Sequence, residues 1–132
     1  MSDRVLLSLL LLGSIALAGT LIRALAQRHY QRVRRLTRLP ATAPWPRILA
    51  FSGPGCSACA VQKRILEQVV AELEGRVQIE HLDATVAHDL ARQFGVLVVP
   101  TTVVAAPDGR VVAINGGLTD LDRLRAQIVN AA

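Results

Sequence analysis

Cys56 and Cys59 are the residues whose type and spacing point most directly to chemistry. They are the only two cysteines in the 132 residues, so they can form one short, reversible pair but no disulfide framework. The segment FSGPGCSAC, residues 51–59, runs from an apolar stretch through a glycine turn to the expected start of a helix. Cysteines at a helix N-terminus have their pKa lowered from about 8.5 to about 3.5–7.5 by free backbone N–H groups and the helix dipole. The position therefore predicts a nucleophilic thiolate at Cys56.

Cys59 follows one helical turn later and is expected on the same side of the helix. It can therefore attack a mixed disulfide formed at Cys56, so the spacing predicts an attacking thiol and a resolving thiol. Two other interpretations are a pair of buried structural cysteines and half of a zinc site. The zinc site would need ligands from His29, His81 and His88, whose spacing fits no common zinc motif.

The elements that must position this pair follow from periodicity and turn residues. Residues 47–52 form a short apolar run before the glycine turn, and the helix from Cys56 is expected to stop at Gly75. Further segments are expected in this order: a strand over 77–82, a helix over 85–94 capped by Thr85, strands over 101–106 and 110–115 joined as a hairpin, and a last helix capped by Thr119 with Asp122. The order β-α-β-α-β-β-α predicts an α/β domain with a parallel strand pair and an added antiparallel hairpin.

The N-terminus carries a candidate transmembrane helix. Residues 5–22 are eighteen positions without a charge, and the apolar character resumes after Arg23 through residue 26. Such a run spans roughly 27 Å, close to the bilayer core of about 30 Å. A cleaved secretory signal is the competing interpretation, since residues 16–18 and 24–26 both read Ala-Leu-Ala. We favour the uncut anchor because the apolar run continues past the first of these sites.

Charge and proline content divide the chain further. Six arginines lie in the sixteen residues after the apolar run, whereas only Arg4 precedes it. Because positive charge flanks a membrane span on its cytoplasmic side, this asymmetry predicts a cytoplasmic C-terminal domain. The alternative is an extracytoplasmic domain. Three prolines within residues 40–46 predict a stiff spacer. We therefore expect a membrane anchor over 1–27, a basic juxtamembrane segment and proline-rich linker over 28–46, and a folded domain over 47–132.

Composition excludes several classes of protein. With 52% hydrophobic and 19% charged residues the chain is not disordered. Residues 1–47 carry a formal charge of +7 and residues 48–132 carry −2, so the excess positive charge lies outside the expected domain. This distribution argues against a nucleic-acid-binding face.

Residues 47 to about 130 resemble the thioredoxin family. Four features match in order: FSGPGCSAC, the sequence Val-Pro-Thr at 99–101, the hairpin PDGRVVA and the sequence GGLTDLDRL before the last helix. The resemblance implies a minimal thioredoxin-like fold, with a mixed four-stranded sheet and helices on both faces. It also implies a cis Pro100 facing the cysteines, with Val99, Pro100, Thr101 and Gly116 lining the substrate groove.

Three positions depart from the family pattern. Gly55 and Ala58 stand where thioredoxins usually carry Trp and Pro, and Ala50 stands where they keep a buried acid that moves the proton of the second thiol. Glu80 or His81 on the neighbouring strand is a weak candidate replacement for that acid.

The resemblance implies a thiol–disulfide oxidoreductase that needs no metal or organic cofactor, and the apolar run predicts that it is tethered to a membrane. Its expected partners are protein disulfide or dithiol substrates, an upstream reductase and the lipid bilayer around residues 5–26, with no nucleic acid. The alternative is a non-catalytic interaction or redox-sensing module on the same fold.

Overall fold

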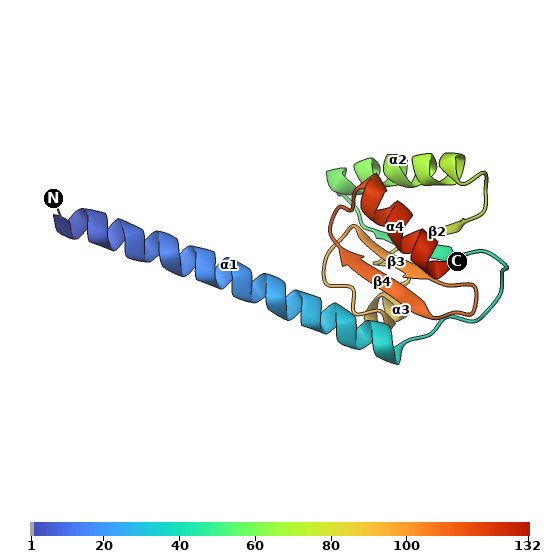
Figure 1. Ribbon diagram of the computed structural model, residues 1–132, viewed down its shortest axis with the longest axis horizontal. Helices are drawn as coiled ribbons and strands as arrows, with labels where there is room; N and C mark the ends of the chain where they lie inside the picture. The colour runs from blue at the N-terminus through green and yellow to red at the C-terminus, as the bar shows by residue number, and fades with distance from the viewer. Residues whose placement is uncertain (1) are drawn as a thin grey trace.

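A single mixed sheet organises the folded part of the chain, and a long helix extends away from it (Figure 1). The computed structural model describes residues 2–132. The elements, in chain order, are α1 (Ser2–Leu36), β1 (Arg47–Ser52), α2 (Ser57–Glu72), β2 (Gln78–Asp83), α3 (His88–Gln93), β3 (Thr101–Ala105), β4 (Val111–Gly116) and α4 (Leu121–Ala131).

The four strands lie in the order β2-β1-β3-β4. Strand β1 pairs in parallel with β2, while β1 with β3 and β3 with β4 are antiparallel. This mixed four-stranded sheet confirms the predicted fold class. The register sets Phe51, near the end of β1, opposite Thr101 at the start of β3, so the segments that follow β1 and precede β3 lie at one end of the sheet.

Each face of the sheet is covered by helices. Ile48 and Val104 pack with Leu66 of α2 and Leu124 of α4 on one face. Leu49 and Val103 pack with Phe94, just after α3, on the other. The alternation along β1 and β3 follows from the two-residue period of a strand, and Figure 1 shows α2 and α4 on the opposite side of the sheet from α3.

Two predicted helix caps are wrong. Helix α3 begins at His88 rather than near Thr85, whose hydroxyl and backbone N–H instead donate to the Asp83 carboxylate at 2.6 and 2.8 Å. The N-cap of α4 is Asp120, which accepts from the backbone N–H of Arg123, and not Thr119. At α4 the Asp120 side chain accepts the N–H of the first turn, whereas the N-cap of α3 is Ala87, which makes no side-chain cap hydrogen bond.

The C-terminal half of α1 packs against the domain. His29 Nε2 lies 3.0 Å from the Gly95 carbonyl oxygen, and Arg34 Nη1 donates to the Val112 carbonyl at 2.7 Å. His29 and Arg34, in the expected juxtamembrane segment, thus contact the loop after α3 and the edge strand β4. The proline-rich segment comes after these contacts in the chain, so it does not hold the helix away from the domain.

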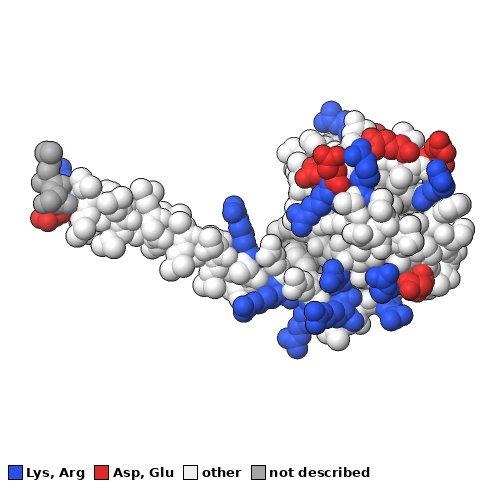
Figure 2. All heavy atoms as spheres, viewed as in Figure 1, with Lys and Arg blue, Asp and Glu red and all other residues white. Residues whose placement is uncertain are grey.

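The N-terminal half of α1 projects beyond the domain. Helix α1 contains a window of mean hydropathy 2.5 with none of it buried, which makes it a candidate membrane span by length and composition. Figure 2 shows this half of the helix largely without charge, with Lys and Arg gathered where the helix meets the domain.

Candidate active site

Cys56 and Cys59 lie at the N-terminus of α2 and are joined by a disulfide bond. Their Cα atoms are 5.3 Å apart, and both residues are partly buried. Cys56 is the N-cap residue of α2, and its Sγ accepts the backbone N–H of Cys59 at 3.1 Å. The sulfur of Cys56 therefore already lies within reach of an amide at the positive end of a sixteen-residue helix, where a thiolate is stabilised.

The turn before Cys56 has a conformation that favours glycine. Gly55 has φ +68°, in the left-handed region that residues with a Cβ adopt at a cost. Gly53 lies against the facing loop, because a Cβ at this position would be 3.3 Å from Cγ2 of Val99. The glycine turn thus brings the start of α2 next to the Val99 loop.

The residues expected to line a substrate groove lie together at this end of the sheet. The Val99–Pro100 peptide bond is cis, and the Pro100 carbonyl accepts the N–H of Gly117 at 2.8 Å. Thr101 pairs with Gly116 across β3 and β4, and its hydroxyl donates to the Val98 carbonyl at 2.6 Å. Pro100 and Thr101 are buried.

The approach to Gly116 is partly taken by α1. A Cβ on Gly116 would lie 2.5 Å from the hydroxyl oxygen of Tyr30 and 2.8 Å from its ring. Glycine at 116 leaves room for the Tyr30 ring, and a larger residue there would have to displace this ring from its place against β4. This contact was not predictable from the sequence, because the two residues are far apart along the chain.

An apolar rim of exposed residues borders the Val99 loop, which faces the glycine turn, and was not expected from the sequence. Leu97, Val98 and Leu118 are 62%, 50% and 53% exposed, in loops that flank Val99 and Gly117. An apolar pair outside any predicted strand or helix, directly before the Val-Pro-Thr segment, is the sequence signal that could have revealed this rim.

The position of the family's buried acid is apolar. Ala50 is 7% exposed and packs in the cluster that includes Leu66 and Val69 of α2. Neither proposed replacement is placed as a buried acid or base: Glu80 is ion-paired with Arg47 at 3.1 Å, and His81 is exposed.

A buried polar network begins beside Ala50, on the neighbouring strand β3. Thr102, the register partner of Ala50, accepts a hydrogen bond from Asn115 Nδ2 at 3.1 Å. The Asn115 and Gln127 side chains exchange two hydrogen bonds of 2.8 Å. These three side chains satisfy one another's hydrogen-bonding groups. None of them titrates, so the network cannot replace the buried acid in proton transfer.

The histidines considered for zinc are not gathered around the cysteines. Among residues 2–132 no group of three or more His, Cys, Asp and Glu side chains is placed to hold a metal ion. His29 contacts the Gly95 carbonyl instead, and His88 lies 3.7 Å from Asp89 on the exposed surface.

Comparison with known proteins gives one consistent family. The family model described as Thioredoxin matches residues 41–130. A thioredoxin of Methanocaldococcus jannaschii is 31% identical over 58 residues, which cover 44% of this chain and 68% of that protein. The SPbeta prophage-derived thioredoxin-like protein YosR of Bacillus subtilis is 30% identical over 84 residues, or 62% of this chain and 98% of that protein. Mitochondrial thioredoxin of Bos taurus is 36% identical over 81 residues, or 61% of this chain and 48% of that protein.

Solved structures share the fold. A structure titled as a malarial protein superposes with a TM-score of 0.60 at 22% identity, covering 66% of this chain and 97% of that one. A structure of thioredoxin-2, described as a component of malaria parasite protein secretion machinery, gives a TM-score of 0.62 at 21% identity, covering 67% of this chain and 85% of that one.

Proposed function

Because this chain belongs to the thioredoxin family, we propose that it is a membrane-tethered thiol–disulfide oxidoreductase that acts on protein disulfides through Cys56 and Cys59. The family and the Cys56–Cys59 disulfide together support thiol–disulfide exchange in general. The observation that carries the assignment of roles is the position of Cys56 as N-cap of α2, with its sulfur accepting an amide N–H.

In the reducing direction the cycle starts from the dithiol. The Cys56 thiolate attacks one sulfur of a substrate disulfide, the substrate S–S bond breaks, and the released substrate thiolate takes up a proton. The Cys59 thiol then loses its proton and attacks Cys56 Sγ, which breaks the mixed disulfide. The substrate leaves with two thiols and the enzyme holds the Cys56–Cys59 disulfide, so two electrons have passed to the substrate. A dithiol reductase or small thiol must return them; the oxidising direction is the reverse.

Substrate binding is assigned to the loop that faces the cysteines. Val99, Pro100, Thr101 and Gly116 lie at the end of the sheet where α2 begins, and the exposed Leu97 and Leu118 add an apolar rim. An extended segment of a substrate protein would contact the backbone at Val99 and the apolar rim, which brings its disulfide to Cys56.

The tether is assigned to residues 5–26 of α1. The apolar window supports a bilayer span, and the arginines that follow it favour a cytoplasmic domain. A C-terminal alkaline phosphatase fusion tests on which side of the membrane the domain lies. The phosphatase should be inactive if the domain is cytoplasmic, and high phosphatase activity would assign the domain to the extracytoplasmic side. A reducing compartment favours the reducing direction.

A trapping experiment tests the roles of the two cysteines. Cys59→Ser leaves the nucleophile without its resolver, so mixed disulfides with substrates should accumulate at Cys56. Cys56→Ser is the matched control and should trap few or none. Wild-type full chain should reduce insulin with dithiothreitol as the electron source, and the absence of both trapping and turnover would contradict the proposal.

One observation favours the alternative of a redox-sensing or interaction module. Ala50 replaces the buried acid, and its surroundings supply no substitute. A sensor would form and lose the Cys56–Cys59 disulfide in step with a redox buffer but would not turn over insulin. Measuring the disulfide equilibrium and the turnover on the same preparation separates these two functions.

A further inference from the structure

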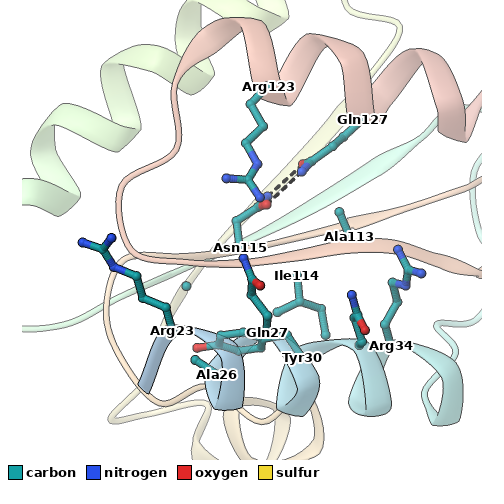
Figure 3. Close-up of a pocket in the computed structure, with 12 residues that line it drawn as sticks. Arg23, Ala26, Gln27, Tyr30, Arg34, Ala113, Ile114, Asn115, Arg123 and Gln127 are labelled. Atoms are coloured by element: carbon teal, nitrogen blue, oxygen red, sulfur yellow. Dashed lines mark hydrogen bonds between the residues drawn. The ribbon is translucent and has the colours of Figure 1, made fainter. Parts of the chain in front are cut away.

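A groove lined by arginines lies where α1 meets the domain. Its volume is about 490 Å³, within the range of small-molecule sites, and it opens between α1, the edge strand β4 and α4. In Figure 3, Arg23 and Arg34 extend from α1 at the two ends of the groove, and Arg123 reaches down from α4 toward Asn115.

The positive charge of the groove is not neutralised by the described part of the chain. None of the residues that line it is Asp or Glu, and none of its three arginines forms an ion pair within residues 2–132. The Arg34 guanidinium donates one N–H to the Val112 carbonyl, whereas the guanidinium groups of Arg23 and Arg123 form no hydrogen bond within these residues. Neighbouring Arg125 differs, because Glu72 and Asp122 bind its guanidinium at 2.6 and 2.8 Å.

The polar members of the groove share one face of α1. Arg23, Gln27, Gln31 and Arg34 follow one another at intervals of four, four and three residues, the spacing of a single helical face. Gln127 and Asn115 close the opposite wall, already bonded to each other. The groove thus offers guanidinium and amide donors with no carboxylate to receive a cation.

The groove begins at the end of the apolar run. Arg23 is the first charged residue after the uncharged positions 5–22, so in a bilayer it would lie at the level of the lipid phosphates. Arg123, in the first turn of α4, comes from the folded domain and would reach the same level only while the domain is docked on α1.

We infer that this groove binds the phosphate of an anionic phospholipid, with Arg23 and Arg123 as its charged ligands. Guanidinium groups suit phosphate because they donate two parallel hydrogen bonds to it. The inference uses the proposed membrane span but not the redox chemistry, and a bound lipid would hold the domain against α1.

Native mass spectrometry of the full chain in detergent micelles tests this inference, with dioleoylphosphatidylglycerol as the probe and dioleoylphosphatidylcholine as the zwitterionic control. We expect one phosphatidylglycerol to be retained about tenfold more strongly than phosphatidylcholine. Arg23→Gln and Arg123→Gln should each weaken retention about tenfold. Arg28→Gln, on the same helix but outside the groove, should change it less than twofold.

Three outcomes would overturn the inference. Equal losses in Arg23→Gln, Arg28→Gln and Arg123→Gln would show general attraction to a basic segment. Equal retention of the two lipids would show no preference for anionic headgroups. Displacement of the lipid by millimolar inorganic phosphate would assign the groove to a soluble anion. Insulin reduction by the same variants reports separately on the proposed function.

Discussion

At the scale of single residues, Ala50 is the substitution with the clearest consequence for catalysis. Its methyl group packs in the apolar layer beneath α2, so no carboxylate there takes the proton of the Cys59 thiol. In the proposed cycle, we therefore expect resolution of the mixed disulfide to depend on solvent for proton transfer and to be slowed more than the first step.

Ala50→Asp should restore that acid. We expect insulin reduction to become several-fold faster, while the free energy of unfolding falls by about 1–3 kcal/mol because a carboxyl group enters a buried apolar site. Turnover and urea unfolding of the full chain measure the two effects. Ala50→Asn has nearly the same shape but does not titrate, so a rate gain shared by Asn would contradict proton transfer as the cause.

Asp83, at the end of β2, provides a test of local electrostatics. The hydrogen bond from the Thr85 hydroxyl, followed by that from the Thr85 backbone N–H, lowers the pKa of this carboxyl from its ordinary value. A lowered folded-state pKa contributes stability that is present above the unfolded value and is lost as the pH falls through the folded value.

Thr85→Val should raise the pKa of Asp83 back toward its ordinary value. The variant keeps the shape and the backbone N–H but removes the hydroxyl, which is the largest cause of the shift. Carbon-detected NMR titration measures the pKa directly, and unfolding at pH 7 and at strongly acidic pH measures the linkage. The stability difference between wild type and variant should be present at pH 7 and vanish in acid; an equal difference at both would exclude this carboxylate as its source.

At the scale of elements, Gln62 connects α2 to the loop before α4. Its side chain is 2% exposed, accepts the N–H of Thr119 at 2.7 Å and donates to the Thr119 carbonyl at 3.1 Å. Gly117 of the same loop donates to the Pro100 carbonyl, so the bond from α2 also fixes the chain beside the facing loop.

Gln62→Leu should leave two buried backbone groups of Thr119 without partners. We expect a loss of about 2 kcal/mol or more in the free energy of unfolding, since each unsatisfied group costs about 1–3 kcal/mol. The KM for insulin should also rise, because the loop beside Pro100 is released. Gln68→Leu makes the same chemical change at an exposed position of α2 and should alter neither quantity; equal effects of the two variants would contradict this role.

At the scale of the whole molecule, the docking of α1 determines where the end of the sheet near Cys56 and Cys59 lies relative to the N-terminal half of the helix. Tyr30, Arg34 and then Leu39 after the helix meet Gly116, Val112 and Gly109 in turn, so the chain from α1 runs antiparallel to β4. The N-terminal half of α1 therefore continues past the end of the sheet that carries the cysteines, as Figure 1 shows. Eight residues, about 12 Å of helix, separate Tyr30 from the end of the apolar run at Ile22.

Because so short a length of helix would separate the domain from the bilayer, disulfides near the bilayer surface should be preferred substrates. In nanodiscs, the full chain should reduce a disulfide next to the span of a test peptide several-fold faster than the same disulfide on a rigid spacer about 30 Å longer. A seven-residue helical insertion between Ile22 and Arg23 raises the domain by about 10 Å with little rotation, and should reduce the preference.

The same insertion between Arg4 and Val5 is the matched control. It lies on the other side of the apolar run, so the preference should persist. Equal rates for both peptides with the unmodified chain would contradict a membrane-facing site, while insulin turnover reports on the chemistry alone.

The local features of the fold were predictable from the sequence. Residues 47–52 and 101–105 are β-branched or apolar runs bounded by turns, and the Pro-Asp-Gly segment sets the hairpin. The Cys56 and Cys59 spacing indicated a pair that can form a disulfide, as the structure has it, because the pairing depends on one helical turn, which neighbouring residues specify. Helix caps were predicted less well, because several polar residues near a helix start can accept the same N–H. At α4 the N-cap is Asp120 and not Thr119.

Only the tertiary structure determined how distant segments meet. The contact of Tyr30 with Gly116, the arginine groove and the apolar surroundings of Ala50 each join residues from elements far apart in the chain. Local patterns determine which face of an element is apolar, but long-range packing determines which partner that face meets. The sequence by itself therefore determined the cysteine pair and the order of elements, whereas the docking of α1, and with it the position of the cysteines relative to this helix, depended on the packed structure.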